Sequence, residues 1–233
     1  MDDKLAIVFE DNHLLVVNKP AGMLVQGDST GDLSLIDHAK NYIKRKYNKP
    51  GNVYLGLPHR IDRPTSGIVV LAKTSKALSR LNKQFSSRET EKTYWTVVKK
   101  PIPTDADELV HYLKKNQKKN KSFAYDKEIP GSKKAILRYR KIAELNNYIG
   151  LEVDLDTGRH HQIRCQLAAI GNPIKGDLKY SFPRSNPDGS IHLHARTISL
   201  AHPVSKEKVS FQAEVPNDVL WNEMEKIVKH GFS

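Results

Sequence analysis

The stretch His59-Arg60-Ile61-Asp62-Arg63-Pro64-Thr65-Ser66-Gly67 decides how the chain is interpreted. It is a polar loop with a proline and a glycine, residues that suit turns, and it leads directly into the apolar run Ile68–Lys73, which predicts a strand. Asp62 lies between two arginines at the start of that strand. Flanking cations favour the ionised form of a carboxylate, so Asp62 can act as an anionic nucleophile at neutral pH. The alternative is a surface loop whose aspartate caps a turn.

The composition favours a negatively charged partner. The chain has 233 residues, enough for one sizeable core, and 38 Lys and Arg against 26 Asp and Glu give a net charge of +12. This excess favours a polyanion because each neutralised phosphate releases counterions, although charge can also serve solubility alone. No long apolar run indicates a membrane, and Met1-Asp2-Asp3-Lys4 begins no signal peptide, so we expect a cytoplasmic protein. The single cysteine, Cys165, allows no internal disulfide and is interpreted as a packing residue.

The hydrophobic pattern predicts one mixed α+β domain over residues 1–233, with a mainly antiparallel sheet and flanking helices. Strands are expected over 5–10, 14–17, 68–73, 92–98, 135–145, 148–156, 191–200 and 207–215, and helices over 34–47, 74–85 and 217–230, with a fourth that follows Thr157-Gly158 and stops at Gly171. Residues 101–135, which include a lysine-rich run over 114–121, are interpreted as a basic loop or hairpin insertion that either contacts phosphates or only adds solubility. Lys19 is expected to be solvated.

Three residues form a candidate catalytic group. Beside Asp62 we single out Tyr94, which points to the opposite side of its strand from Trp95, and Arg164, at the border of the apolar stripe of its helix. A carboxylate, a tyrosine ring and a guanidinium suit attack on an electrophilic carbon of a planar base or of its sugar. The arginine would orient the carboxylate and the ring would stack on the target.

Five segments resemble, in the same order, the motifs of the RluA-type pseudouridine synthases. The opening loop matches H-R-L-D-x-x-T-S-G, with Ile61 in place of the usual leucine. The other four are Leu14–Gly22, Glu91–Tyr94, Thr157–Arg164, and His194-Ala195 with His202-Pro203. The resemblance covers nearly the whole chain. It implies the pseudouridine synthase catalytic fold without the N-terminal S4-like domain of many relatives.

The resemblance also implies a reaction, the isomerisation of uridine to pseudouridine in RNA. The bond from N1 to C1′ breaks and the uracil reattaches through C5, which requires neither a cofactor nor a metal. By motif match, Asp62 is the catalytic aspartate, Tyr94 the active-site tyrosine and Arg164 the basic residue that pairs with the aspartate. Arg60 matches the arginine that enters the RNA and helps to expel the uridine. Substrate binding is assigned to His59, Arg60, Arg63, Thr65 and His160.

Several alternatives stay open. Asp62 can attack C1′ or the base, or initiate a glycal route, and Tyr94 can act as a base as well as a stacking ring. The expected partner is structured RNA, ribosomal or transfer, bound by a monomer. The rivals are an RNA-binding module that has lost catalysis and a base-excising glycosidase, which would require a second carboxylate. A metal site is disfavoured because the histidine pairs lack the cysteine spacings of a zinc module.

Overall fold

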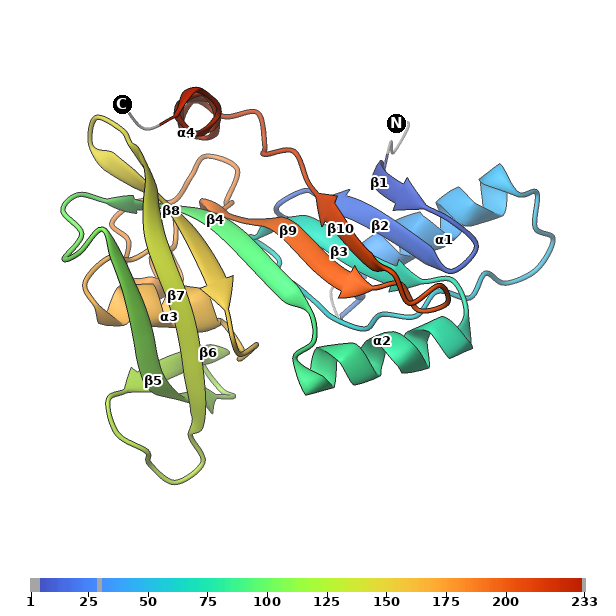
Figure 1. The fold of residues 1–233 in the computed structure, drawn as a ribbon, viewed down its shortest axis with the longest axis horizontal. Helices are drawn as coiled ribbons and strands as arrows, with labels where there is room; N and C mark the ends of the chain where they lie inside the picture. Colours follow the sequence, from blue (N-terminus) through green and yellow to red (C-terminus); the bar gives the residue numbers. More distant parts are fainter. Residues whose placement is uncertain (1–4, 29–30, 232–233) are drawn as a thin grey trace. The chain divides into compact units, whose positions relative to one another are not determined.

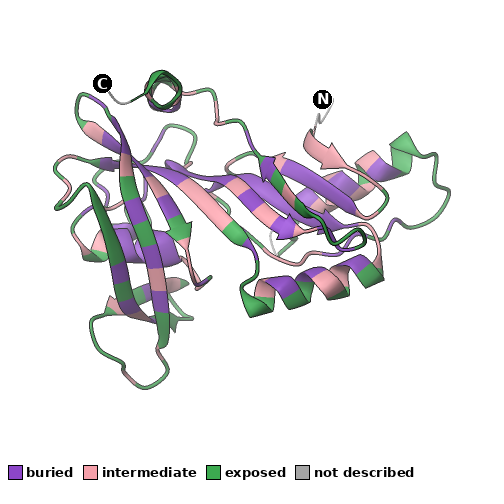
Figure 2. Cartoon of the chain, in the orientation of Figure 1, coloured by how far each residue is buried: buried purple, intermediate pink, exposed green. Residues whose placement is uncertain are grey.

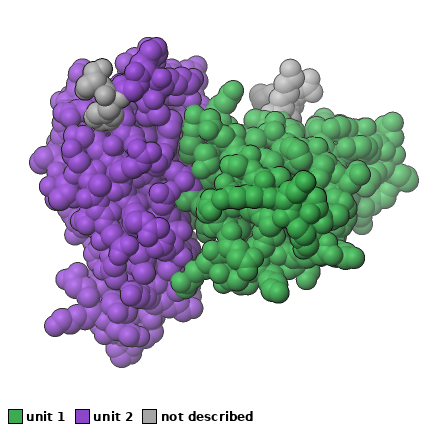
Figure 3. Space-filling model, viewed as in Figure 1, with its two compact units in different colours: residues 1–92, 195–214 green, residues 93–194, 215–233 purple. Residues whose placement is uncertain are grey.

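The structure is a computed structural model that describes residues 5–28 and 31–231. The segment Met1–Lys4, in which we expect no signal peptide, lies outside these residues. The described chain contains ten strands, four α-helices and one 3-10 helix, which confirms the expected α+β class. Its contacts form two compact units, coloured separately in Figure 3: unit 1 comprises residues 1–92 and 195–214, and unit 2 comprises residues 93–194 and 215–233.

Unit 1 is built on the strand order β1-β2-β3-β9, with β10 paired to β9 (Figure 1). The β1-β2, β2-β3 and β9-β10 pairs are antiparallel. The bounds are β1 Ala6–Glu10, β2 Leu14–Lys19, β3 Ser66–Ala72, β9 Leu193–Ala201, β10 Lys208–Gln212, α1 Leu35–Lys46 and α2 Ser75–Ser87. Neighbouring residues of β2 and β3 point to opposite faces, yet all of Leu14–Val17 is buried, so both faces of these strands lie in the core.

The helices of unit 1 begin at residues that cap them. At α1, Asp37 accepts hydrogen bonds from the Ser34 N–H (3.0 Å) and hydroxyl (2.6 Å). At α2, the Thr74 hydroxyl accepts a hydrogen bond from the Ala77 N–H at 3.1 Å and caps the helix that was expected over 74–85. The apolar side of α2 then packs on β2, β3 and β9 through Ala77 and Leu81.

Unit 2 is an antiparallel sheet in the order β4-β8-β7-β5-β6 (Figure 1). The bounds are β4 Glu91–Lys99, β5 Ala106–Asn116, β6 Lys121–Tyr125, β7 Lys133–Glu144, β8 Tyr148–Leu155, α3 Gln162–Ala169, the 3-10 helix η1 Leu178–Tyr180 and α4 Val219–His230. The two sides of β4 join different clusters. Tyr94 and Val98 pack with α3 residues, while Trp95 and Val97 pack with Trp221 of α4, so the predicted opposite orientation of Tyr94 and Trp95 is confirmed.

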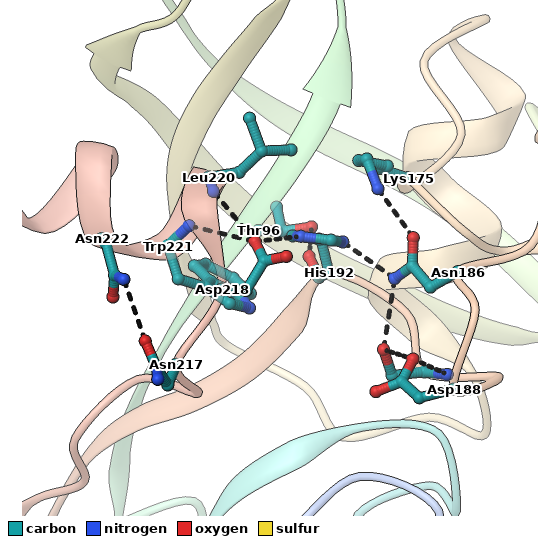
Figure 4. Close-up of polar contacts among 11 residues, drawn as sticks. Thr96, Lys175, Asn186, Asp188, His192, Asn217, Asp218, Leu220, Trp221 and Asn222 are labelled. Carbon is teal, nitrogen blue, oxygen red and sulfur yellow. Dashed lines mark hydrogen bonds and ion pairs between the residues drawn. The ribbon is translucent and has the colours of Figure 1, made fainter.

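The histidine His192 joins α4 to the rest of unit 2 (Figure 4). The side-chain amide of Asn186 lies 2.9 Å from Nδ1 of His192, and Nε2 of His192 lies 3.0 Å from Asp218. Asp218 also accepts hydrogen bonds from the N–H groups of Leu220 and Trp221 at the start of α4. Burial lowers the pKa of His192 more than Asp218 raises it, which favours the neutral ring. The ring stacks on Trp221, with 5.3 Å between centroids, so one imidazole connects the 186–192 loop to the helix cap.

Candidate active site

The Asp62 loop is fixed through its backbone. The Thr65 N–H donates to the Asp62 carbonyl at 3.1 Å and closes the Arg63-Pro64 turn. The Gly22 N–H donates to the Arg63 carbonyl at 2.8 Å and holds the loop against the turn that follows β2. Asp62 is partly exposed, whereas the neighbouring Ile61 is buried. The loop therefore buries its apolar residue Ile61, while Asp62 stays partly exposed.

Gly67 is required where this loop enters β3. Its φ is +114°, a region that residues with a side chain rarely adopt, and it pairs with Lys19 of β2. A Cβ at this position would lie 2.5 Å from the backbone nitrogen of Ala195 and would also collide with the carbonyl oxygen of that residue. The glycine thus allows β9 to approach β3 directly behind the loop.

Lys19 holds the Asp62 loop through the Arg63 carbonyl. The expectation that Lys19 is solvated is wrong. Its side chain is fully buried, and Nζ donates to the carbonyls of Pro20 (2.8 Å), Met23 (2.9 Å) and Arg63 (3.2 Å). Three backbone carbonyl oxygens replace water around the ammonium group, and no side-chain pattern in the sequence marks such acceptors. Burial lowers the pKa of Lys19 to about 7, while the Asp62 carboxylate raises it. Lys19 therefore places a basic nitrogen near the carboxylate and ties two turns together.

The two arginines beside Asp62 are both exposed. Arg63 donates through Nε to the Gly22 carbonyl at 2.9 Å and forms an exposed ion pair with Asp32 at 2.9 Å. Arg60 is exposed.

Thr65 is buried, and its hydroxyl has no hydrogen-bond partner among residues 5–28 and 31–231.

His59 is fixed to the strand that follows the loop. Its Nε2 accepts a hydrogen bond from the Val70 N–H at 2.9 Å, and its ring stacks on Phe85 of α2 with 4.7 Å between centroids. Burial, assisted by the positive charge of Lys92, lowers the pKa of His59 to about 3. The neutral ring can accept from Val70, and a proton on Nε2 would abolish that bond.

In unit 2, Arg164 is held by an acid that the sequence analysis did not single out. Nε and Nη2 of Arg164 donate to the two carboxylate oxygens of Asp177 at 2.7 and 2.9 Å, and both side chains are almost completely buried. The ring of Tyr180 lies 5.2 Å from the guanidinium carbon. Asp177 precedes, and Tyr180 ends, the three-residue helix η1. A helix this short has no periodicity, so no sequence signal connected these residues with Arg164.

His160 lies between α3 and the β5–β6 hairpin. Its Nδ1 is 2.9 Å from the Ser122 hydroxyl, which donates to the His160 carbonyl at 2.7 Å, and its Nε2 is 3.1 Å from the side-chain oxygen of Asn120. The ring stacks on His161, with centroids 3.8 Å apart. These contacts hold the turn of the hairpin to the start of α3.

The candidate residues are divided between the units. The loop residues His59, Arg60, Asp62, Arg63 and Thr65 belong to unit 1. Tyr94, half-buried on β4, belongs to unit 2, as do His160 and Arg164. A site that combines Asp62 with Tyr94 and Arg164 therefore draws on both units and stays a prediction.

Cys165 is a packing residue, as expected. Its side chain is buried, its thiol donates to the Ser122 carbonyl at 3.3 Å, and burial raises its pKa to about 12. Across residues 5–28 and 31–231, no three His, Cys, Asp or Glu side chains are grouped so as to hold a metal ion. Within the same residues, no helix has the length and apolar character to cross a membrane.

The fold is that of pseudouridylate synthase domains. The structure of human RNA pseudouridylate synthase domain containing 4 superposes with a TM-score of 0.77 at 22% identity, covering 96% of this chain and 93% of that one. The structure of human RNA pseudouridylate synthase domain containing 1 superposes with a TM-score of 0.73 at 21% identity, covering 95% of this chain and 88% of that one. At these identities the likeness establishes the fold.

Sequence relatives establish the family. Residues 13–169, more than half of the chain, match the family described as RNA pseudouridylate synthase. Ribosomal large subunit pseudouridine synthase D of Zymomonas mobilis is 34% identical over 228 residues, which cover 94% of this chain and 71% of that protein. Dual-specificity RNA pseudouridine synthase RluA of Haemophilus influenzae is 32% identical over 221 residues, covering 92% and 94%. The chain belongs to the RNA pseudouridylate synthase family, and it is an isomerase that converts uridine in RNA to pseudouridine.

Proposed function

We propose that Asp62 is the catalytic carboxylate, that Tyr94 covers the target uridine, and that Arg164 orients the carboxylate. The observation that carries this proposal is the Asp62 loop itself. Lys19 and Gly22 fix its backbone at Arg63, while the Asp62 side chain remains partly exposed. A carboxylate on a loop whose backbone is fixed suits covalent or acid–base chemistry on a bound base.

The geometry of Arg164 supports its role. A guanidinium has five N–H donors in a rigid fork, so the two bonds to Asp177 are compatible with a further bond to a second carboxylate. Asp177 fixes the plane of the guanidinium, because both of its oxygens are engaged at once. A cation fixed in this way is suited to orienting the Asp62 carboxylate through hydrogen bonds.

The target uridine must leave its stack before the reaction, which costs a few kcal/mol. Stacking on a ring such as Tyr94 can return about 1–3 kcal/mol per base. Arg60 is exposed, and it is proposed to enter the RNA in place of the uridine. Arg63 and His160 are proposed to contact the flanking nucleotides. Thr65, which was assigned to the substrate-binding set, is buried and is proposed to support the loop from inside, and His59 is proposed to hold the loop through its bond to Val70.

The proposed substrate is a structured ribosomal or transfer RNA, bound by a monomer in the cytoplasm. One relative is named for the large ribosomal subunit and another for dual specificity, so both RNA classes are candidates. The net charge of +12 suits a long polyanion rather than a free nucleoside, because each phosphate neutralised adds to the affinity.

The test is Asp62→Asn, which removes the charge and preserves the shape. Purified wild-type protein incubated with a candidate RNA transcript should form pseudouridine without a change in RNA mass, whereas a glycosidase would remove a base. Asp62→Asn should bind the same RNA with similar affinity and form no pseudouridine. Turnover by Asp62→Asn would overturn the assignment of the catalytic carboxylate.

A further inference from the structure

The sheet of unit 2 has one surface with exposed aromatic side chains. Residues of β5 and β7 alternate between buried and exposed, as the striped colouring of these strands shows (Figure 2). Leu109 and Leu113 of β5 point toward the α3 side and are buried. The opposite side carries Val110, Phe123 and Tyr125, which are 40%, 37% and 38% exposed. Helix α4 packs on the Trp95 side of the sheet through Ile142 and Ala143, at the far end of β7.

The strand register places cations among these rings. Lys114 pairs with Phe123, Tyr112 pairs with Tyr125 on one side, and on the other side Tyr112 pairs with Lys134. Side chains of directly paired residues project from the same face of a sheet, and residues two positions apart on one strand, such as Phe123 and Tyr125, lie about 7 Å apart. We call this surface the aromatic face; its residues are Val110, Tyr112, Lys114, Lys121, Phe123, Tyr125 and Lys134.

The ammonium group of Lys121 lies near two aromatic rings. Its ammonium nitrogen lies 5.7 Å from the centroid of Phe123 and 4.8 Å from that of Tyr180. Lys114 and Lys134 are both exposed. The face therefore combines aromatic rings with positive charges, which suits stacked bases joined by phosphates.

The middle of β6 is poorly suited to pairing with an added strand from a partner. The Ser122 N–H already donates to the hydroxyl of Tyr180 at 2.9 Å, and the Ser122 carbonyl accepts from the Cys165 thiol at 3.3 Å. Backbone pairing with an added strand needs such groups to be available. This favours recognition at the hairpin through the side chains of the aromatic face.

We propose that the aromatic face binds an unpaired stretch of the substrate RNA, with bases stacked on Phe123 and Tyr125 and phosphates beside Lys114 and Lys134. This inference rests on the proposed function, because it takes RNA as the substrate. Exposed aromatic residues on a sheet surface are a general means of binding single-stranded RNA, since every base has a flat face that can stack. The net charge of +12 provides the matching electrostatic attraction.

The experiment compares Phe123→Ala, Tyr125→Ala and the double variant with two controls in the full chain. Tyr125→Phe keeps the ring, and Val204→Ala truncates a residue of unit 1 that is 47% exposed. The probe is a fluorescent, unstructured twelve-nucleotide RNA, measured by anisotropy at fixed salt. We expect each ring removal to weaken binding about fivefold or more, and both controls to bind as wild type. If the double variant binds the RNA as tightly as wild type, the proposal is wrong. The same result would be expected if this face instead bound a protein partner.

A second measurement uses the wild-type protein, so it does not depend on whether a variant folds. It also separates RNA binding at the aromatic face from catalysis at Asp62. Wild-type protein photo-crosslinked to the same RNA containing 5-iodouridine should yield adducts on the 121–125 peptide, and adducts confined to other peptides would contradict the proposal. Asp62→Asn should crosslink there as wild type does. If wild-type protein forms pseudouridine but crosslinks elsewhere, only the aromatic face is wrong. If Asp62→Asn still turns over, only the catalytic assignment is wrong.

Discussion

Arg164 illustrates how a single residue depends on a partner distant in sequence. It forms a buried bidentate ion pair with Asp177, and removing one member of such a pair leaves an uncompensated charge, which typically costs about 3–5 kcal/mol. If Arg164 orients Asp62, Asp177→Asn should lower kcat about tenfold or more at saturating RNA, because a small displacement of a positioning group is expensive. RNA affinity should change little. The matched control is Glu223→Gln, whose surface pair with Lys226 contributes little. An unchanged kcat in Asp177→Asn would contradict the role of Asp177.

His59 gives a prediction about pH. Its pKa is lowered from 6.5 to about 3 in the folded protein, so the native state binds fewer protons than the unfolded state between these values. The contribution of His59 to stability is therefore complete above pH 6.5 and is lost progressively as the pH falls toward 3. His59→Gln cannot titrate and still offers Val70 an acceptor. Melting temperatures measured from pH 7.5 to 5 should fall less steeply for His59→Gln than for wild type, whereas parallel profiles would refute this account.

What the sequence could and could not reveal also differs by residue. Asp62 and its neighbours were identifiable because they are contiguous. Lys19 was misjudged because its partners are the backbone carbonyls of Pro20, Met23 and Arg63, which no side-chain pattern marks. Asp177 was missed because its contact with Arg164 depends on the path of the chain between them.

At the scale of elements, segments with a clear period were predictable. The helix expected over 74–85 is α2, and the strands expected over 135–145 and 148–156 are β7 and β8. The strand β5 was harder to see. Its alternation of buried Leu109 and Leu113 with exposed residues is the ordinary pattern of a strand, but the lysines at its end dominated the interpretation.

The lysine-rich run 114–121 spans the end of β5, the connecting turn and the start of β6. If it contacts phosphates, replacing Lys114, Lys115, Lys118 and Lys119 by Gln should weaken RNA binding and reduce the slope of log K against log salt by about 0.7 for each lysine engaged with single-stranded RNA. The control replaces Lys226 and Lys229, which belong to α4. Binding titrations from 50 to 300 mM salt, a range of roughly sixfold chosen to resolve that slope, provide the measurement. An unchanged slope would show that these charges serve solubility alone.

At the scale of the whole molecule, the chain builds two cores and passes between them at residues 92–93, 194–195 and 214–215. The catalytic residues we propose follow this division, with Asp62 in unit 1 and Tyr94 and Arg164 in unit 2. The reaction class was predictable from motifs spread over nearly the whole chain. The division into two units was not, because the apolar periodicity that predicts each strand does not indicate which strands share a core.

The central claim is that this chain isomerises particular uridines in cellular RNA through Asp62. The most direct measurement is pseudouridine mapping across all RNAs from cells that lack the protein, complemented with either wild-type protein or Asp62→Asn. We predict that one or a few uridines lose the modification in the deficient cells, regain it with wild-type protein, and remain unmodified with Asp62→Asn. Restoration by Asp62→Asn, or the absence of any uridine whose modification depends on the protein, would contradict the account.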